Sequence, residues 1–422
     1  MRIRQIRTLL AGAVVALAAL ATLSSVSPAA ARRADAGAKH ADGGGPATAL
    51  VLQWYDITSN TVSAAAFAEP VTQSRTWAVS WLAAARASEN GWDPNYRAAA
   101  FAQALHDTLV AQVPSQQSQL DVDLASTLAG IPDGSAKNAG IAAGKQQASS
   151  VLASRAGDGL DTASVDSPFT PPPPGPGVWQ PTPPTYGPAI RAGQGKARPF
   201  LLARNDQFDP GPPPSLSSST YLRSLAEVRA YGSATSTVRT PQQTDTAKFW
   251  EPAANIQYVQ ILRGALAQTN AQSLSQIRLV AAFNVITTDA QIAIYNAKYK
   301  YLFWRPVTAI RTGVVDPDPS WTPLFNTPLH PEYPSGHGGY AGAAQGVLSA
   351  FFGHRTPGPI SATSPTDPGS THTYNDWSSI TQEVIDARVW EGIHFRSSDD
   401  TGAEVGERVA DYDLGRLRSL GL

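Results

Sequence analysis

The feature that most constrains the fold of this 422-residue chain is one long apolar stretch, SLSQIRLVAAFNVITTDAQIAIYNAKYKYLFW, at residues 273–304. Its apolar residues lie on most sides of a helix rather than along one stripe. Such a helix must be covered by other elements all round, because any exposed face would leave apolar side chains in water. The stretch therefore predicts a buried central helix, and the rest of the chain has to supply its cover.

Further helices are predicted before and after this stretch. Between about residues 60 and 156, Ala, Leu, Gln and Ser recur at helical spacing. Helical patterns return near 218–220, where a Ser or Thr can cap a helix, and again at about 378–396 and 399–418. The small-residue stretch GHGGYAGAAQGVLSAFFG is expected to pack closely on its neighbours. Since no convincing series of strands is found, the predicted fold class is all-α.

A proline-rich segment, SPFTPPPPGPGVWQPTPPTYGP, interrupts the helical patterns at residues 167–188. Its prolines exclude both a helix and a central strand. The segment can be a linker between domains or a long ordered loop on the surface. We favour the loop, with Trp179 and Tyr186 as its anchors, because such aromatic residues are uncommon in free linkers.

The N-terminus has the pattern of a signal peptide. Basic MRIRQIR is followed by apolar TLLAGAVVALAALATL and by an A-x-A-type cleavage site that ends at Ala31. The alternative is an N-terminal membrane anchor, and no later apolar run is judged long enough to span a bilayer. We expect an exported, secreted protein without a stable membrane anchor.

The chain is accordingly divided into a signal peptide at 1–31 and a disordered N-terminus at 32–48. An N-terminal helical region at 49–156 follows, and a Pro-rich loop or linker at 157–214. The last and largest part is a helical catalytic region at 215–422. With 42% hydrophobic and 15% charged residues, the chain can bury a large core.

Charge and sulfur content narrow the function classes. The net charge of -1 gives no support for a nucleic-acid partner. The chain has no cysteine, which excludes disulfides and thiol chemistry, and its one methionine is Met1. A chain without the easily oxidised sulfur residues suits a protein that works beside a strong oxidant. Genome composition explains the same observation equally well.

The first polar motif is KYKYLFWRP, in which Lys298 and Arg305 stand seven residues apart. Seven residues are two helical turns, so both cations would lie on one face if the helix continued. Pro306 disfavours helix at the residue before it, which places Arg305 near the helix end. Each cation alone could simply cover a buried helix with its apolar stem.

Two further motifs are PEYPSGHGGY, with Ser335, Gly336 and His337, and ARVWEGIHF, with Arg388 and His394. Turn chemistry alone could explain the serine and the glycine. Arg388 and His394 are six residues apart, somewhat off one helical face, but both long side chains could converge on one site. A single histidine is more often structural than catalytic.

Together the three motifs supply what a tetrahedral oxyanion such as phosphate or vanadate needs. Lys298, Arg305 and Arg388 can surround one anion, and the arginines offer forked donors. The Ser335 hydroxyl and the Gly336 N–H add donors of the oxyanion-hole kind. Two histidines remain, one to bind or attack the central atom and one to move a proton. The sequence contains no Gly-rich phosphate loop, HExxH, CxxC or GxSxG pattern.

In this order, K-x6-R-P, P-S-G-H and R-x5-H resemble the three motifs of the superfamily of vanadium-dependent haloperoxidases and type 2 phosphatidic acid phosphatases. All three spacings match, and the resemblance covers about residues 215–415. The stretch EVRAYGSATSTVRTPQQTDTAKFW also resembles the secreted, haloperoxidase-related branch. The resemblance implies a helical bundle of the vanadium haloperoxidase and acid phosphatase type.

The resemblance also implies a role for each motif residue. His394 would be the axial vanadate ligand, and His337 the acid–base residue beside the apical oxygen. The equatorial oxygens would be held by Lys298, Arg305, Ser335, Gly336 and Arg388. Vanadate is the implied cofactor, and phosphate can occupy the same pocket because the two ions have nearly the same shape.

Three functions are consistent with this set of residues. The first is a vanadate-dependent haloperoxidase that oxidises a halide with hydrogen peroxide to hypohalous acid, which then reaches a small organic substrate. The second is a secreted acid phosphatase that works through a phosphohistidine. The third is an oxyanion-binding protein without catalysis. A homo-oligomer is left open.

His330 bears on the choice of halide. It stands seven residues before His337, where the resemblance places a histidine in bromide-using enzymes and an aromatic residue in chloride-using ones. We therefore expect His330 near the halide and favour bromide. An ordinary loop histidine is an equally good explanation.

Some positions depart from the family pattern. Ala387 stands where a serine usually precedes the motif arginine. Asp399 lies one position further from His394 than the usual aspartate. Glu227 and Asp289 are the candidates for a carboxylate that orients Arg388 or a histidine.

Overall fold

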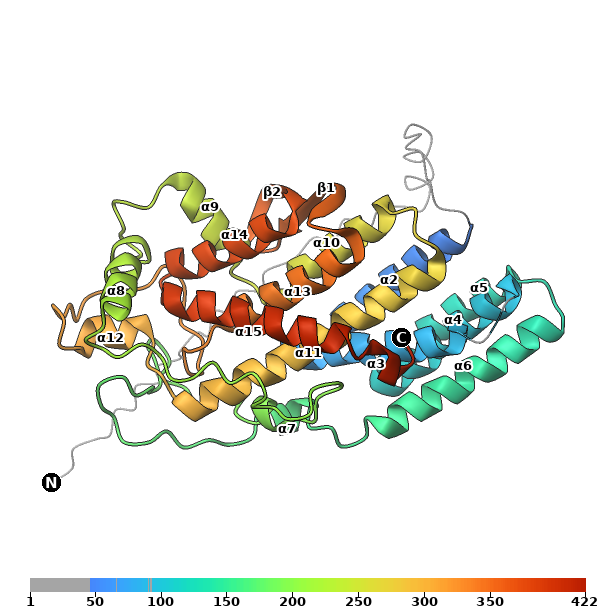
Figure 1. Ribbon diagram of the computed structural model, residues 1–422, viewed down its shortest axis with the longest axis horizontal. Helices are drawn as coiled ribbons and strands as arrows, with labels where there is room; N and C mark the ends of the chain where they lie inside the picture. The colour runs from blue at the N-terminus through green and yellow to red at the C-terminus, as the bar shows by residue number, and fades with distance from the viewer. Residues whose placement is uncertain (1–45, 66, 90, 92) are drawn as a thin grey trace, which may run out of the picture. The chain divides into compact units, whose positions relative to one another are not determined.

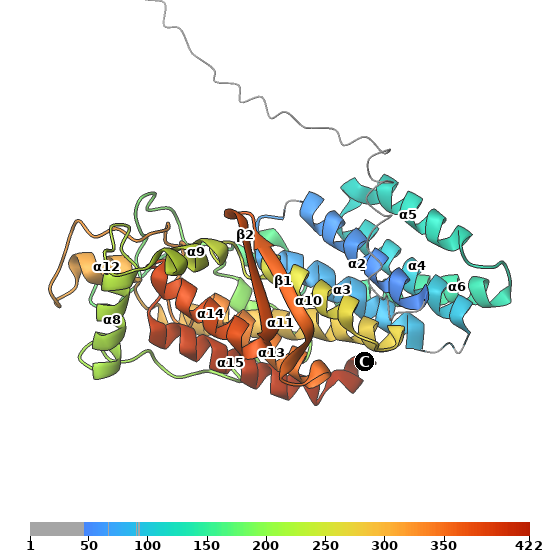
Figure 2. The same ribbon diagram turned by 90° about the horizontal axis from the view of Figure 1, so that it is seen from above.

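The computed structural model describes residues 46–422 except 66, 90 and 92, all within one compact unit, Gly43–Leu422. Most of these residues are helical (Figures 1 and 2). The helices are α2 (Pro46–Ala64), α3 (Pro70–Glu89), α4 (Pro94–Gln112), α5 (Gln117–Ala129), α6 (Ser135–Ser154), α7 (Thr162–Val165), α8 (Ser219–Tyr231), α9 (Pro241–Phe249), α10 (Asn255–Gln268), α11 (Ser273–Tyr301), α12 (Pro306–Thr312), α13 (Gly336–Phe352), α14 (Trp377–Trp390) and α15 (Arg396–Leu414). Short 3-10 turns are η2 (Pro114–Gln116), η3 (Gln194–Lys196) and η4 (Leu417–Leu420), and the strands are β1 (Arg355–Ser364) and β2 (Asp367–Asp376).

The predicted buried central helix is α11, and the all-α fold class is confirmed. Helix α11 packs against α3, α13 and α15, which supply the cover that its apolar sides require (Figure 1). It is long and apolar enough to cross a membrane, so the prediction that no later run has that length was wrong. Because 89% of its most apolar window is buried by the rest of the fold, α11 has the surroundings of a core helix.

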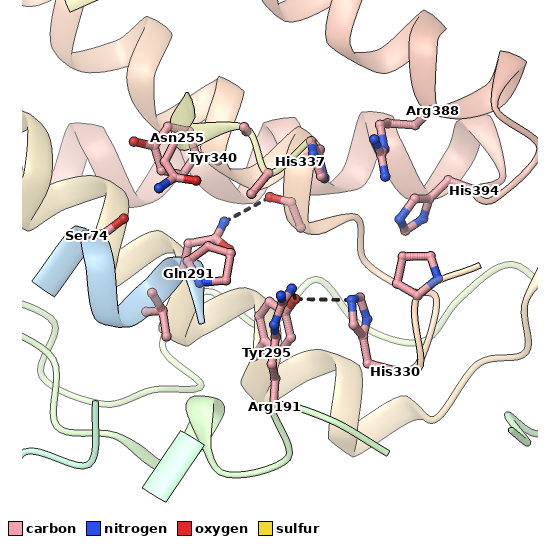
Figure 3. Close-up of a pocket in the computed structure, with 16 residues that line it drawn as sticks. Ser74, Arg191, Asn255, Gln291, Tyr295, His330, His337, Tyr340, Arg388 and His394 are labelled. Carbon is pink, nitrogen blue, oxygen red and sulfur yellow. Dashed lines mark hydrogen bonds between the residues drawn. The ribbon is translucent and has the colours of Figure 1, made fainter. Parts of the chain in front are cut away.

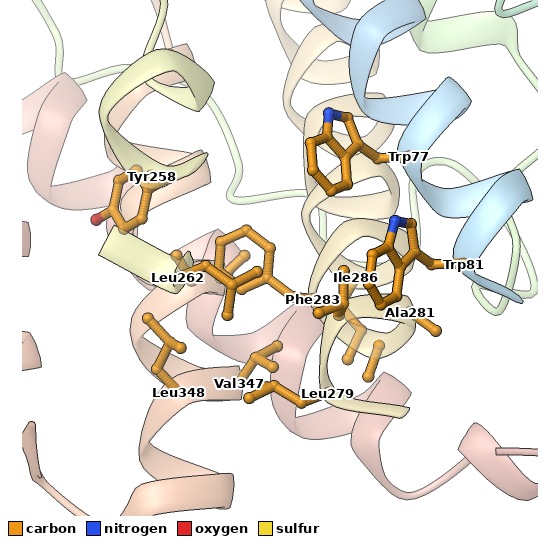
Figure 4. Close-up of a cluster of buried hydrophobic side chains, with 14 of the residues drawn as sticks. Trp77, Trp81, Tyr258, Leu262, Leu279, Ala281, Phe283, Ile286, Val347 and Leu348 are labelled. Atoms are coloured by element: carbon orange, nitrogen blue, oxygen red, sulfur yellow. The ribbon is translucent and has the colours of Figure 1, made fainter. Parts of the chain in front are cut away.

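Large side chains from four helices form the core around α11 (Figure 4). Trp77 and Trp81 of α3 lie with ring centroids 6.2 Å apart and face α11. From the other neighbours, Tyr258 of α10 and Val347 of α13 pack against Phe283 of α11. Burial of each side chain of this size stabilises the fold by about 1.5–3 kcal/mol. The core therefore holds α11 in one position against the helices that carry the site.

The predicted close packing of the small-residue stretch is confirmed in α13. A methyl group on Gly342 would clash with the backbone of Ala403 in α15, and one on Gly406 would clash with the backbone of Gly339. The two helices therefore touch backbone to backbone. Their N-terminal ends meet as well, since the Ser335 N–H donates to the Ser398 carbonyl over 2.9 Å.

Helix ends follow local chemistry in most places. Ser218 caps α8, as expected, by accepting the Tyr221 N–H over 3.2 Å. The central helix ends earlier than expected, at Tyr301, because Leu302 adopts a left-handed conformation with φ of 48°. The predicted helix at 378–396 likewise ends at Trp390.

The hairpin of β1 and β2 was not predicted from the sequence. Ile360 and Ala362 point inward from β1, but prolines and Ser/Thr residues hide the alternation that marks a strand. Side chains of α10 hold the hairpin in place: Gln260 donates to the Thr363 carbonyl and Gln268 to the Pro359 carbonyl, both over 2.9 Å. Tertiary packing, rather than strand propensity, selects this conformation.

The proline-rich segment is held along the end of α11. Trp179 is fully buried, and its backbone N–H donates to the Leu302 carbonyl over 2.7 Å. Tyr186, expected as a second anchor, is 63% exposed. Further along, Asp289 of α11 accepts the backbone N–H groups of residues 200–202. The predicted signal peptide and most of the predicted disordered N-terminus lie outside the described residues, and α2 begins at Pro46, inside the range 32–48.

Candidate active site

One cavity of about 70 Å³ brings most of the motif residues together (Figure 3). This volume is several times the roughly 10–15 Å³ that a single water requires, so a small oxyanion fits. The lining residues come from five helices and the segments between them: Pro70, Val71, Ser74, Arg191, Ala253, Ala254, Asn255, Gln291, Tyr295, Pro328, His330, Gly336, His337, Tyr340, Arg388 and His394. Three predicted site residues, Lys298, Arg305 and Ser335, are fully buried beside this lining rather than in it.

Lys298 and Arg305 do not share a helix face, because the helix does not continue to Arg305, which lies beyond its end as Pro306 predicted. Helix α11 ends between them, and Arg305 is extended (φ -82°, ψ 156°) at the start of α12. They meet instead on one short segment. Lys298 Nζ donates to the carbonyls of Pro331 (3.0 Å) and Glu332 (2.7 Å), and Arg305 Nε donates to the His330 carbonyl over 3.0 Å. The turn after α11 thus brings the two cations to the segment that precedes α13.

His394 presents an unprotonated ring nitrogen to the site. Its Nδ1 lies 2.8 Å from Glu332 Oε1 and donates to it, while Nε2 accepts from Arg305 Nη1 over 3.1 Å. Burial and the charges of Arg305 and Lys298 hold the pKa of His394 well below its usual range. The neutral ring therefore keeps a lone pair on Nε2, which is the form that a metal centre or a phosphorus atom requires.

Glu332 fixes this orientation and was not singled out from the sequence, although it lies inside PEYPSGHGGY. Its carboxylate also accepts the Phe395 N–H (2.9 Å) and the Ser398 hydroxyl (2.6 Å). Burial raises the pKa of Glu332 to about 7, against the opposing charge of Arg305 and the Ser398 hydrogen bond. A second carboxylate, Glu391, accepts from Arg388 over 2.8 Å.

Replacing Glu332 with glutamine is expected to weaken orthovanadate binding roughly tenfold, the usual effect of losing an outer partner of a ligating histidine. The amide keeps the shape of the side chain but no longer selects the His394 tautomer that leaves Nε2 free. Calorimetric titration measures the change, with Glu404→Gln on the exposed part of α15 as the control. Unchanged affinity would show that Glu332 does not orient His394.

The carboxylates proposed from the sequence lie elsewhere. Glu227 pairs with Arg396 at 2.7 Å, and Asp289 binds the backbone of the proline-rich segment. Asp399 is fully buried at the start of α15, and burial raises its pKa well above the usual range. Glu332 and Glu391 take the roles expected of Glu227 and Asp289, because the loops after α12 and α14 bring them to the cations.

Arg388 occupies the last turn of α14. Its Nη1 donates to the Trp250 carbonyl and to Glu391 Oε1, both over 2.8 Å. The buried Nε has no hydrogen-bond partner among the described residues. Burial raises the pKa of Glu391 to about 8, with Arg388 opposing the rise. Arg388 thus retains a free donor in the pocket wall.

Ser335, Gly336 and His337 form the start of α13. The Ser335 hydroxyl accepts the Gly338 N–H over 3.3 Å, which caps the helix. A helix N-terminus favours an anion because its first N–H groups lack partners. His337 Nε2 donates to the Pro252 carbonyl over 2.9 Å, which leaves Nδ1 unprotonated. Burial, and then the charge of Arg388, lowers the pKa of His337 well below 6.5.

His330 is buried in the pocket wall, close to the cations. Its Nδ1 accepts from Arg305 Nη2 over 3.1 Å, and its Nε2 lies 3.3 Å from the Tyr295 hydroxyl (Figure 3). Tyr295 in turn accepts from Arg191 Nη1 over 3.1 Å, and Arg191 also pairs with Glu69. Tyr295 could have been found from its spacing of three from Lys298 on α11. Arg191 gave no such signal, because it lies in the proline-rich segment.

The residues present fit a tetrahedral or pentacoordinate oxyanion such as vanadate. In the part of the chain that the structure describes, neither Lys298 nor Arg305 forms an ion pair, and Arg388 Nε lacks a partner. A buried charge without compensation costs several kcal/mol, so Lys298 and Arg305, with the unpaired Nε of Arg388, favour an anion between them. Lys298, Arg305, Ser335, Gly336 and Arg388 would hold its oxygens, and His394 Nε2 would bind the central atom.

Comparisons with known proteins find similar sequences and similar folds. The family model for the VCPO second helical-bundle domain matches residues 278–420, which contain all three motifs. Vanadium chloroperoxidase from Curvularia inaequalis is 31% identical over 148 residues. That match spans about a quarter of the relative's length, 24%, and 28% of this chain.

Two solved structures share the fold over most of the chain. A bacterial vanadium-dependent iodoperoxidase has a TM-score of 0.75 at 23% identity, over 86% of this chain and 96% of its own. A bacterial vanadium-dependent chloroperoxidase in its holo form has a TM-score of 0.66 at 18% identity, over 83% and 92%. The chain thus has the fold of these two structures, and its residues 278–420, which carry the three motifs, match the VCPO second helical-bundle domain.

Proposed function

We propose that the protein is a vanadate-dependent haloperoxidase that uses hydrogen peroxide to oxidise a halide to hypohalous acid. The observation that carries the proposal is the unprotonated Nε2 of His394, which lies at the cavity beside Arg305, a buried cation that forms no ion pair among the described residues. The vanadium haloperoxidases among its relatives support the same reading. When bound, vanadate would supply a Lewis-acidic centre that polarises peroxide without changing its own oxidation state.

The residues of the chain would divide the remaining work. Lys298 and Arg305 would draw negative charge from the oxygens bound beside them, since both are buried where a charge acts strongly. His337 would accept or return a proton through Nδ1, because Nε2 is held by the Pro252 carbonyl. Glu332 would keep His394 in its ligating tautomer.

Bromide is the halide that we favour. His330, the residue that suggested it, is buried in the pocket wall and bonded to Arg305, so it is close enough to influence a small anion in the cavity. The structural neighbours are an iodoperoxidase and a chloroperoxidase, which makes iodide and chloride the necessary comparisons. A cavity of about 70 Å³ suits peroxide, a halide ion and the edge of a small organic substrate.

Paired assays on the purified protein, before and after loading with orthovanadate, test the proposal. One assay follows bromination of a phenolic dye with hydrogen peroxide and bromide, with iodide and chloride in parallel, and the other follows hydrolysis of an aryl phosphate. We expect bromination that depends on vanadate, with little hydrolysis.

A phosphatase is the second candidate, since the lone pair of His394 Nε2 could also attack phosphorus. Hydrolysis that orthovanadate inhibits, without oxidation of any of the three halides, would establish that function instead. Neither activity, with binding of both oxyanions weaker than millimolar, would indicate a protein without catalysis.

We also propose that the protein is exported after removal of residues 1–31. Sequencing the N-terminus of protein recovered from the culture medium tests this. Retention of the intact chain in the membrane fraction would favour an anchor instead.

A further inference from the structure

His372, on β2, lies between two carboxylates outside the pocket. Its Nδ1 is 2.6 Å from Glu383 Oε1 of α14, and its Nε2 is 2.9 Å from Asp245 Oδ2 of α9. The ring of Phe249 stacks on the imidazole, with centroids 3.9 Å apart and planes 8° apart. Both hydrogen bonds can form only when both ring nitrogens carry a proton. We call Asp245, His372 and Glu383 the histidine clamp.

A short segment after α9 connects the histidine clamp to the pocket. Trp250 Nε1 donates to Glu383 Oε1 over 2.9 Å, and the carbonyl of the same tryptophan accepts from Arg388 Nη1 over 2.8 Å. Two residues later, the Pro252 carbonyl accepts from His337 Nε2 over 2.9 Å. Residues 250–252 thus contact the clamp through the Trp250 side chain and the pocket residues through two backbone carbonyls.

The clamp end of this connection is tightly held. Glu383 Oε1 receives His372, Trp250 and the Tyr374 hydroxyl, the last over 2.9 Å. Three donors on one carboxylate oxygen leave it little freedom, and hydrogen bonds in such a network strengthen one another. Loss of the His372 donor would loosen Glu383 and, through it, Trp250.

We propose that the histidine clamp is a positioning element of the active site, which sets the places of Arg388 and His337 through Trp250 and Pro252 and does so fully only while His372 is doubly protonated. The proposal concerns positioning residues, since no clamp residue lines the pocket. It rests on the proposed function only in taking the pocket to bind an oxyanion.

The charged groups around His372 define the pH range of the clamp. Burial alone would lower the pKa of His372, but the hydrogen bonds and charges of Glu383 and Asp245 raise it above 6.5. Burial would raise the pKa of Asp245, but its bond to His372 lowers it below 3.8. Tyr374 and Asp367 on β2, Lys248 on α9 and Tyr258 on α10 are the further titratable groups beside the cluster.

The sign of the pH effect follows from these two shifts. A raised histidine pKa contributes stability that is complete below 6.5 and is lost as pH rises through the folded value. A lowered aspartate pKa contributes stability that is present above 3.8 and is lost as pH falls through the folded value. Between pH 3.8 and 6.5 the clamp therefore keeps both hydrogen bonds of His372. As the pH rises further, His372 loses one proton and with it one of the two bonds.

The chain offers a matched control for His372 in His106. Its ring nitrogens also lie between two carboxylates, 2.7 Å from Asp107 and 2.8 Å from Asp121, and both histidine side chains are 12% exposed. His106 belongs to α4, which contributes no residue to the pocket lining described above. His106→Gln therefore reproduces the loss of a clamped histidine without touching the connection.

The experiment compares His372→Gln, Trp250→Phe and His106→Gln by orthovanadate titration at pH 6 and by nuclear magnetic resonance of the labelled His337 ring. We expect affinity to fall roughly tenfold in the first two variants, as for other outer-shell changes, and to be unchanged in His106→Gln. The His337 signal should shift only in the first two. In the unmodified protein, affinity should show an alkaline step above pH 6.5 that His372→Gln lacks.

The proposal is overturned if His372→Gln and His106→Gln lose thermal stability alike while the orthovanadate affinity and the His337 signal stay as in the unmodified protein. If His372→Gln fails to fold, Trp250→Phe alone decides, because it leaves His372 in place and removes the indole N–H that donates to Glu383. Absence of orthovanadate binding in the unmodified protein would count against the proposed function. The His337 signal would still report whether the clamp reaches the pocket.

Discussion

Replacing His394 with alanine is expected to abolish tight binding of orthovanadate, with an affinity loss of at least about 100-fold. The loss should exceed the effect of an outer-shell change, because the variant removes the nitrogen that would bind the central atom. That nitrogen, Nε2, is unprotonated in the structure. The ring is held from both sides, by Arg305 at Nε2 and by Glu332 at Nδ1. Equilibrium dialysis or calorimetry measures the affinity.

The exposed His354 provides the control, since His354→Ala removes a histidine far from any motif residue in the sequence. The His394 variant also leaves Glu332 without its ring partner, so thermal unfolding must be followed in the same samples. His394→Gln, which can still donate to a carboxylate, separates a folding defect from a binding defect. Retention of full orthovanadate affinity in a folded His394→Ala protein would refute the axial assignment.

Replacing His337 with alanine is expected to spare orthovanadate binding and to lower turnover by roughly two to four orders of magnitude, the usual size of acid–base catalysis. His337 is neutral near pH 7, because burial and the charge of Arg388 lower its pKa. Its Nε2 is engaged with the Pro252 carbonyl, so Nδ1 is the nitrogen free to take a proton. Steady-state halide oxidation and orthovanadate affinity are measured on the same preparation.

The two histidine variants should therefore separate binding from proton transfer. His394→Ala is expected to lose both affinity and turnover, and His337→Ala to lose turnover alone. Turnover near that of the unmodified protein in His337→Ala would exclude the acid–base role. Equal loss of affinity in both variants would mean that His337 also holds the anion.

The sequence predicts a structural feature well when the residues that determine the feature lie close together in the sequence. The all-α class and the buried central helix follow from periodicity and apolar content, which are properties of α11 itself. The Ser218 cap and the small-residue contact of α13 are equally local. These predictions hold because neighbouring residues of one helix determine them.

The site shows the limit of this reasoning. The motifs name Lys298, Arg305, Arg388 and His394, and the structure gathers all four around one cavity. Lys298 and Arg305 do not meet along one helix face. Leu302, in a left-handed conformation, ends α11, and the turn that follows brings Arg305 to the same segment as Lys298. Local spacing therefore selected the residues but not the geometry.

The sequence by itself determined the helical class, the oxyanion chemistry of the motifs and the superfamily resemblance, because each depends on residue type and on spacing within a short stretch. Only the tertiary structure decided which carboxylates hold the histidine and the arginine, that Arg191 and Tyr295 line the cavity, and that a β-hairpin is joined to it through Trp250. Apart from Glu391 and Arg388, which are three residues apart, these contacts join distant residues: Glu332 and His394 are 62 positions apart, and Trp250 and Arg388 are 138 apart. Nothing in a local pattern encodes such pairs, because packing of the whole core around α11 brings them together.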